Sequence, residues 1–238
     1  MTNESKCGLA PFCKNAGKPS VCNDVCGAFI GVSSRYGQAD IPKDYEGIYL
    51  ENSPAKDEQD TIYKPLSEYV KTFAKDDVRI KNLYLYSKAT GTGKTTTAIA
   101  LLNEYIRRRF LYYVRKKAHI PETLALFLDL NEYQTRYNLA TMSRDEDDMN
   151  AIKEQIIRYS TVEFLAVDDV GVRSATEAFR AIVHSIINAR VTNGLPTVFT
   201  SNIRLNELTT VFDARLQDRI QDQCLPLTFT GESKRGRR

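Results

Sequence analysis

The sequence predicts an α/β protein in which a parallel five-stranded sheet is flanked by helices. Short apolar runs of strand length alternate with longer segments whose apolar residues recur at helical spacing. One strand-to-helix junction carries a glycine-rich turn, and a later strand ends in two adjacent aspartates. Such alternation favours a parallel sheet covered on both faces. A cysteine-rich module at residues 1–39 is expected to precede the α/β domain at residues 40–238.

The composition is that of an ordinary globular chain. It has 238 residues, of which 42% are hydrophobic and 26% charged, and a formal net charge of +3. That charge is too small to indicate nucleic-acid binding by itself. No apolar stretch approaches the ~20 residues that span a membrane, and the first residues form no apolar signal segment. We therefore expect a cytoplasmic protein without membrane contact, where structural disulfides are unusual.

The elements are expected in a regular order. Apolar, β-branched or aromatic runs predict strands at residues 83–86, 124–130, 162–167, 197–200 and 225–229. Helical spacing predicts helices at residues 65–74, 94–110, 131–140, 144–158, 174–192 and 212–220. The helix at 94–110 ends in Arg107, Arg108 and Arg109, which suit a helix C-terminus and are expected to be solvated.

The junction after the first strand predicts a phosphate-binding loop. It matches the end of the pattern G-x-x-x-x-G-K-[ST], although Lys88 replaces the first glycine. Two glycines let backbone N–H groups approach phosphate oxygens, Lys94 supplies a positive charge, and the Thr95 hydroxyl is suited to hold Mg²⁺. The alternative is a plain Gly-Thr turn. The candidate ATP-binding residues are Thr90, Gly91, Thr92, Gly93, Lys94, Thr95 and Thr96.

Acidic and polar residues at later strand ends complete the predicted site. Asp168 is expected to hold the Mg²⁺ shell, and Asp169 to orient the attacking water. Asn202 follows the next strand and is a candidate for contact with the γ-phosphate; an Asn turn is the alternative. Arg215 and Arg219 share one helix face, where either is a candidate arginine finger or a partner in a surface ion pair.

Four of the five cysteines lie in the front segment, at Cys7, Cys13, Cys22 and Cys26. Four thiolates around a short loop can hold a structural Zn²⁺, which would supply folding energy that so short a segment lacks. Two disulfides or four free thiols are the alternatives. Cys224 is expected in the core, and the isolated His119 and His184 are expected to be packed or on the surface.

The order of these motifs resembles one group of AAA+ ATPases. They are similar to the motifs of the DnaC/DnaI helicase loaders, and IstB-like transposition ATPases share this core. The motifs are, in order, the P-loop, the strand ending in Asp168-Asp169-Val-Gly, the strand ending in Thr-Ser-Asn202, and Arg215-Leu-Gln-Asp-Arg219-Ile. The cysteine-rich front resembles the zinc module of DnaI-type loaders. The compact form is similar to phage-encoded versions.

The resemblance implies an ATPase that places a hexameric DnaB-type replicative helicase on single-stranded DNA. It also implies self-association through the AAA+ domain, helicase contact through the zinc module, and a sensor role for Arg235. Because Asp169 is shorter than the more usual Glu, hydrolysis is expected to be slow. The segment with Tyr133, Arg136 and Tyr137 is a candidate for DNA contact, with core packing of the tyrosines as the alternative. Rival functions are an IstB-like partner of a transposase and a helicase or initiator inhibitor that binds ATP.

Overall fold

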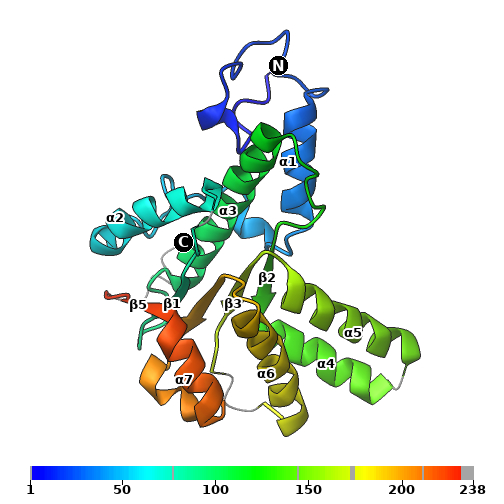
Figure 1. Ribbon diagram of the computed structural model, residues 1–238, viewed down its shortest axis with the longest axis vertical. Helices are drawn as coiled ribbons and strands as arrows, with labels where there is room; N and C mark the ends of the chain where they lie inside the picture. The colour runs from blue at the N-terminus through cyan, green and yellow to red at the C-terminus, as the bar shows by residue number, and fades with distance from the viewer. Residues whose placement is uncertain (1, 77, 144, 172–174, 211, 232–238) are drawn as a thin grey trace.

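A computed structural model describes residues 2–76, 78–143, 145–171, 175–210 and 212–231 (Figure 1). Its centre is the predicted five-stranded sheet, in which every strand pairing is parallel. The strands are β1 (Asn82–Tyr86), β2 (Ala125–Asp129), β3 (Phe164–Asp168), β4 (Thr197–Ser201) and β5 (Cys224–Thr228).

The strand order is β2-β3-β4-β1-β5, so β4 lies between the strand before the glycine-rich loop and the strand that ends in Asp168. Parallel pairing brings the carboxyl ends of all strands to one edge. In register, Asp129 pairs with Asp168 and Tyr86 pairs with Ser201. The loops after these strands therefore meet at one edge of the sheet.

Alternate side chains of the strands enter two separate cores. On one face Leu83 and Leu85 pack with α1 (Gly27–Gly37), α2 (Asp60–Tyr69) and α3 (Lys94–Lys116). On the other face Tyr84 packs with α4 (Leu130–Ser143), α5 (Glu146–Thr161), α6 (Glu177–Thr192) and α7 (Ala214–Gln223). This period-two alternation makes a sheet with helices on both sides (Figure 1).

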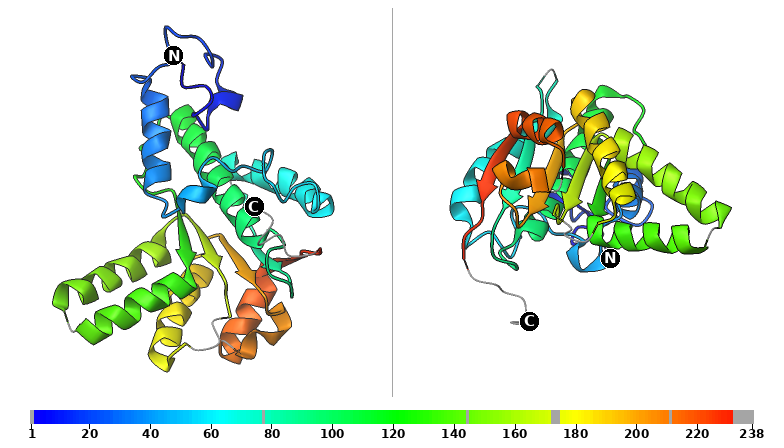
Figure 2. Two further views of the ribbon diagram at one scale, coloured as in Figure 1. Left: turned by 180° about the vertical axis from the view of Figure 1, so that it is seen from behind. Right: turned by 90° about the horizontal axis from the view of Figure 1, so that it is seen from below.

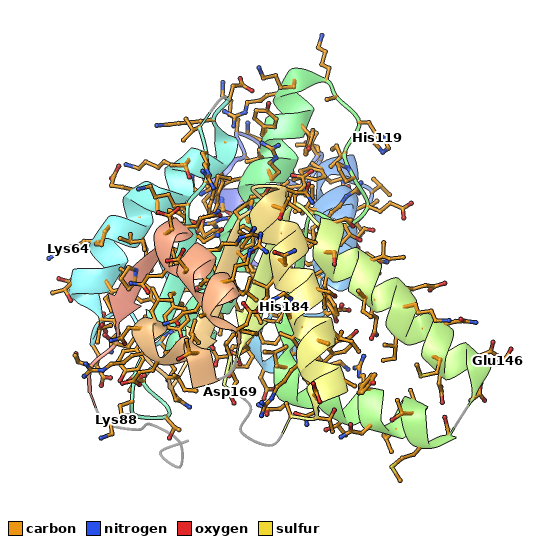
Figure 3. All side chains as sticks on the ribbon, turned by 60° about the horizontal axis from the view of Figure 1, so that its bottom comes forward. Lys64, Lys88, His119, Glu146, Asp169 and His184 are labelled. Carbon is orange, nitrogen blue, oxygen red and sulfur yellow. The ribbon has the colours of Figure 1, made fainter. Side chains whose placement is uncertain are left out.

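The helices of the first face are arranged around α3, with α1 on one side and α2 on the other (Figure 2). On the second face α4 and α5 form a hairpin that projects from the sheet, and Glu146 marks its tip (Figure 3). Asp145 caps α5 by accepting a bond from the Asp147 N–H, as expected of an acidic helix start. Thr176 caps α6 through the Phe179 N–H, while Ser174 lies outside the described residues.

Helix α3 continues to Lys116, beyond the predicted end near residue 110, and Arg107 is not solvated. Its side chain is 2% exposed and forms ion pairs with Glu51, at 2.7 Å, and with Glu104. It also stacks over Tyr49, with 4.1 Å between the guanidinium carbon and the ring centroid. Burial by itself lowers the pKa of Arg107, but the bonds to Glu51 and Glu104 raise it overall. The expectation of a solvated arginine triplet was therefore wrong for Arg107.

A second buried arginine fixes the edge of the sheet opposite the loops. Arg190 on α6 is 0% exposed and donates to the carbonyl oxygens of Tyr159, Val162 and Pro196 at 2.8–2.9 Å. It also donates to the Thr197 hydroxyl at 2.9 Å. These acceptors lie at the end of α5 and just before or at the start of β3 and β4, so one guanidinium joins the amino ends of two strands.

The front segment packs on the first face of the molecule. Leu9 and Val32 belong to the same core as α3, and the Ala39 carbonyl accepts a bond from the Phe127 N–H at 2.8 Å. Arg35 on α1 donates to the carbonyl oxygens of Ile120 and Pro121 at 3.0 and 3.1 Å. The segment therefore rests on α3 and β2. Among the helices that the structure describes, none has the length and apolar character needed to cross a membrane.

Candidate nucleotide site

The loop between β1 and α3 adopts a conformation that requires its glycines. Gly91 and Gly93 have φ values of 71° and 94°, in the left-handed region that L-residues with a Cβ disfavour. A Cβ on Gly93 would also lie 2.5 Å from the Cβ of Ala55. Gly93 therefore permits both the turn and the close approach of the segment before α2.

Lys94 and Thr95 open α3 at this loop. Lys94 is buried, and its Nζ donates to the Ala89 carbonyl inside the loop at 3.0 Å. The Thr95 hydroxyl donates to the two carboxylate oxygens of Asp168 at 3.0 and 3.1 Å. The loop and the end of β3 thus meet, as expected of residues predicted to form one site.

Asp168 is a buried carboxyl with hydroxyl partners. The Thr200 hydroxyl on β4 donates to its Oδ1 at 2.5 Å. Burial raises the pKa of Asp168 to about 6; the bonds from Thr200 and Thr95 oppose this rise, and the charges of Asp129 and Asp169 add to it. The hydroxyl and carboxylate oxygens are hard donors of the kind that Mg²⁺ prefers, and they already lie together. The Thr95 hydroxyl and the Asp168 carboxylate are therefore suited to the predicted role of Mg²⁺ ligands.

Asp169 is held in an unusual backbone conformation, with φ of 59°. Its N–H donates to the Thr200 hydroxyl at 3.0 Å, and its Oδ2 accepts from the Asn131 amide at 2.7 Å. Asn131 was not predicted as part of the site. It stands at the start of α4, directly after β2, and this position at a strand end was the available signal.

These residues line a cavity of about 920 Å³ at the carboxyl edge of the sheet. Asn202 lines it, as expected of the polar residue after β4. The sequence did not predict the contribution of the segment before α2, which supplies Tyr45, Pro54, Ala55 and Glu58 to the lining. The other lining residues are Thr90, Gly91, Thr92, Gly93, Lys94, Thr95, Thr96, Asp129, Asn131, Asp168, Asp169 and Thr200.

The two candidate arginine fingers lie away from this chain's own cavity. Arg215 and Arg219 are on α7, outside the described cavity lining, and Arg219 donates to Asn188 on α6 at 2.7 Å. Arg235 lies outside the described residues. An arginine finger acts on the nucleotide of a neighbouring subunit, so the position of α7 in a single chain does not test it. The finger role of Arg215 or Arg219 stays a prediction.

The four front cysteines do not form a metal site in the described part of the chain. No group of three or more His, Cys, Asp or Glu side chains is placed there to hold a metal ion. Cys7, Cys22 and Cys26 are half-buried and Cys13 is exposed, all as free thiols. Burial raises the pKa of the Cys7 thiol, and the three other cysteines add to that rise. The described side chains therefore show no zinc site, and the zinc module stays a prediction, although the other three thiols lie near enough to influence the pKa of Cys7.

The remaining candidates have structural roles. Cys224 is buried, as predicted. His184 contacts Asp213 at 2.6 Å and His119 lies beyond α3, so the two histidines are far apart (Figure 3). Tyr133 is 3% exposed, and Tyr137 packs on Phe179 in the same core. Both tyrosines therefore agree with the alternative of core packing, and the buried Tyr133 ring is not available to stack on a base in this conformation.

Comparison with known families decides the relationship. Residues 72–238 match the model of the family described as "IstB-like ATP binding protein". The chain belongs to this family. Among curated proteins, this IstB-like protein is 26% identical to the replicative helicase loader DnaI of Bacillus subtilis (strain 168) over 73% of its length and 53% of the loader's. It is 25% identical to the replicative helicase loader DnaC of Escherichia coli (strain K12) over 65% of its length and 56% of the loader's.

The IstB-like protein thus spans about half the length of the curated relatives it matches. A crystal structure of DnaI superimposes with a TM-score of 0.58 and 22% identity, over 82% of this chain and 94% of that one. This likeness confirms the α/β fold with a parallel five-stranded sheet that the sequence predicted. Family membership supports nucleotide binding at the cavity that contains Lys94, Thr95 and Asp168.

Proposed function

We propose that this IstB-like protein is a slow, Mg²⁺-dependent ATPase that helps to load a replicative hexameric helicase onto single-stranded DNA. The observation that carries the ATPase proposal is the contact between Thr95 and Asp168 inside a cavity lined by a phosphate-binding loop. The similarity to two replicative helicase loaders supports the role in replication. The partner helicase, DNA binding, self-association and a cytoplasmic site of action are parts of the same proposal.

Each residue of the cavity is assigned a role by its position. Backbone N–H groups of residues 90–95 and the Lys94 ammonium hold the phosphates at the start of α3. Thr95 and Asp168 hold Mg²⁺, which when bound neutralises charge that develops on the transferred phosphoryl group. Asp169 orients and polarises the attacking water, Asn131 fixes the Asp169 carboxylate, and Asn202 contacts the γ-phosphate.

The part of the lining that comes from the segment before α2 is suited to the nucleoside. Pro54 and Ala55 offer apolar surface, Tyr45 an aromatic ring, and Glu58 a carboxylate, all from the segment before α2. The acidic residues assigned to catalysis, Asp168 and Asp169, come instead from the end of β3. We therefore place the base against residues 45–58 and the γ-phosphate near Asp169 and Asn202.

Slow hydrolysis follows from the second acidic residue. Asp169 has one methylene fewer than Glu, and its Oδ2 is already engaged by Asn131 at 2.7 Å. A water that attacks the γ-phosphate must approach this short side chain closely to be polarised. A slow switch suits a loader, which acts once in each loading event.

The front segment is proposed as the helicase-binding module, stabilised by Zn²⁺. Support comes from four cysteines within 20 residues and from the mutual influence of their thiols. The segment also exposes Val21, Val25 and Ile30, and Val25 is 83% exposed. Apolar side chains grouped on one module are a common feature of protein interfaces.

Lys94→Ala tests the nucleotide proposal. Binding of a fluorescent ATP analogue and hydrolysis should both be lost, because the charge on the phosphates is no longer neutralised. Lys64→Ala is the matched control, since Lys64 on α2 is exposed and pairs only with Asp60 in the described contacts. Normal analogue affinity in Lys94→Ala would remove the assignment of the phosphate-binding loop.

Co-purification tests the partner. The sequence resemblance to IstB-like transposition ATPases gives one second candidate, a partner ATPase of a transposase. The loader proposal is supported if the full chain retains a replicative helicase and if this retention is lost when residues 2–39 are removed. Retention of a transposase instead supports the second candidate. A loading assay on circular single strands then separates a loader, which raises helicase activity, from an inhibitor, which lowers it.

A further inference from the structure

A buried glutamine lies behind the phosphate-binding loop. Gln59 is 2% exposed and directly precedes α2. Its amide nitrogen donates to the Thr230 carbonyl at 2.6 Å and to the Thr92 carbonyl at 3.4 Å. Thr92 lies between the two glycines of the loop, and Thr230 follows β5. One amide therefore joins the loop to the carboxyl end of the edge strand.

The main chain of Gln59 is fixed independently. Its N–H donates to the carbonyl oxygens of Ala55 and Lys56, and its own carbonyl accepts from Ile62 and Tyr63 at 2.8 and 2.9 Å. The side chain is therefore presented from a rigid base. Because the backbone is held at both sides, the amide can hold the loop in place.

A second connection runs from the same segment to the neighbouring loop residue. The Tyr63 hydroxyl lies 2.6 Å from the Ser53 hydroxyl and 2.8 Å from the Thr97 hydroxyl. Thr97 in turn donates to the Gly93 carbonyl at 2.8 Å. Successive carbonyls of the loop, at residues 92 and 93, are thus both held by side chains, those of Gln59 and Thr97.

The loop still contains one buried polar atom without a partner. Within the described residues the Thr92 hydroxyl has no hydrogen bond, although Thr92 is 4% exposed. The bond from Gln59 to Thr92 is also long, at 3.4 Å. Both observations point to a loop that can still tighten at Thr92. Loops with glycines in the left-handed region lose much conformational freedom when they become fixed.

We propose that Gln59 is a positioning residue that holds the phosphate-binding loop in its nucleotide-binding geometry and couples it to the chain after β5. This inference rests on the proposed function, since it concerns the same nucleotide cavity. Gln59 acts through the Thr92 carbonyl, and nucleotide binding shortens that bond. The end of β5, held by the same amide at Thr230, is stabilised in the same event.

Gln59→Leu tests this role because leucine fills similar space but donates no hydrogen bond. Affinity for a fluorescent ATP analogue should fall about tenfold, the order expected when buried carbonyls lose their donor. Amide exchange at Phe229 and Thr230 should slow on ATP binding in the wild-type chain, and this change should be absent in Gln59→Leu. A purely structural glutamine would lower the unfolding midpoint without altering either nucleotide response.

Gln217→Leu is the matched control, because Gln217 also donates an amide bond to a carbonyl, that of Leu205 at 3.3 Å, on α7. Its analogue affinity should equal that of the wild type. If Gln59→Leu does not fold, Gln59→Asn replaces it: the shorter amide cannot span both carbonyls, and a several-fold loss of affinity is expected. Wild-type affinity in a folded Gln59 variant would overturn the inference alone. Failure of the wild-type chain to bind ATP would overturn the proposed function, and the inference with it.

Discussion

Thr95 and Asp168 are hydrogen-bonded at 3.0 and 3.1 Å across 73 positions of sequence. The bond joins the first turn of α3 to the end of β3, although β4 separates β1 from β3 in the sheet. The Thr95 and Thr200 hydroxyls both donate to the carboxylate that is proposed to hold Mg²⁺. An ion held by Asp168 would have to replace the hydrogen bonds that these hydroxyls donate, and burial disfavours the charged form of the carboxyl without it.

Asp168→Asn should abolish hydrolysis but stabilise the metal-free protein at pH 8. The pKa of Asp168 is about 6 in the folded state against an ordinary 3.8. Between these values the folded state binds more protons than the unfolded state, so stability falls as the pH rises through this window. The gain from Asn should be on the order of 2–3 kcal/mol at pH 8 and should fade toward pH 4.

Urea unfolding of metal-free protein at pH 8 and pH 4 measures this effect. Asp218→Asn, at an exposed position on α7, is the control and should change stability little at either pH. A loss of stability in Asp168→Asn that is equal at both pH values would contradict the prediction.

Gly93→Ala should prevent nucleotide binding. The substitution meets both the positive φ of 94° and a contact of 2.5 Å with the Ala55 Cβ. Gly194→Ala isolates the backbone cost, because Gly194 has a φ of 64° and nothing within 4 Å of an added Cβ; it should lower stability by about 1 kcal/mol. Adding Ala55→Gly to Gly93→Ala should recover part of the lost stability in urea unfolding. Equal stability of the two single variants would show that the Ala55 contact is unimportant.

Arg107→Leu should cost about 3 kcal/mol, because buried Glu104 would keep only Arg108 as a cation and Glu51 would lose its partner. Chemical unfolding measures the loss. Arg115→Ala on the same helix is exposed and should stay within about 0.5 kcal/mol of the wild type. The double variant Arg107→Met with Glu104→Leu should be more stable than Arg107→Leu, since no buried charge is left over. A double variant no more stable than the single one would contradict this explanation.

Arg215→Ala and Arg219→Ala test the arginine finger by subunit mixing. If one arginine acts on a neighbour's nucleotide, its variant should bind ATP normally but hydrolyse it at least about tenfold more slowly. Mixing that variant with Lys94→Ala should restore part of the activity, because one subunit then supplies the nucleotide and the other the arginine. Arg136→Ala, which loses only an exposed pair with Glu132, is the control. No recovery with either arginine variant would discard both residues.

Metal content tests the front segment. Protein purified under reducing conditions should contain about one zinc per chain. A strong chelator should then unfold residues 2–39, seen as rapid amide exchange there, while amides of the sheet stay protected. Cys26→Ser should lose the metal and Cys224→Ser, in the other core, should keep it. Absence of zinc from fresh, reduced protein would end the zinc proposal.

The sheet and the centre of the site were predictable because their signals are local. Each strand is a short apolar run, and Lys94 and Asp168 directly follow glycines or apolar residues that mark a loop or a strand end. Parallel strands place such ends at one edge, so the meeting of Thr95 with Asp168 followed from pattern alone. The strand bounds shifted by one or two residues at most positions, as expected of frayed ends.

Features made by distant segments were not predictable. Arg107 has the sequence context of a solvated helix end, and only the arrival of Glu51 and Tyr49 buries it. Helix α2 begins at Asp60, five residues before the predicted start, because the Gln59 carbonyl accepts the first helical bonds and Pro65 is tolerated within the helix. Tyr45 and Glu58 reach the cavity only through the path of the segment before α2, which carries no pattern of its own.

The guanidinium of Arg190 has a mechanical consequence for the ATPase cycle. It clamps the amino ends of β3 and β4 together, while Asp168 and Asn202 stand at or just beyond the other ends of these strands. Two strands pinned at one end and paired along their length cannot slide past each other. The proposed metal ligand Asp168 and the proposed phosphate contact Asn202 are thereby held at a fixed spacing, so any movement in the proposed ATPase cycle has to come from the loops around them.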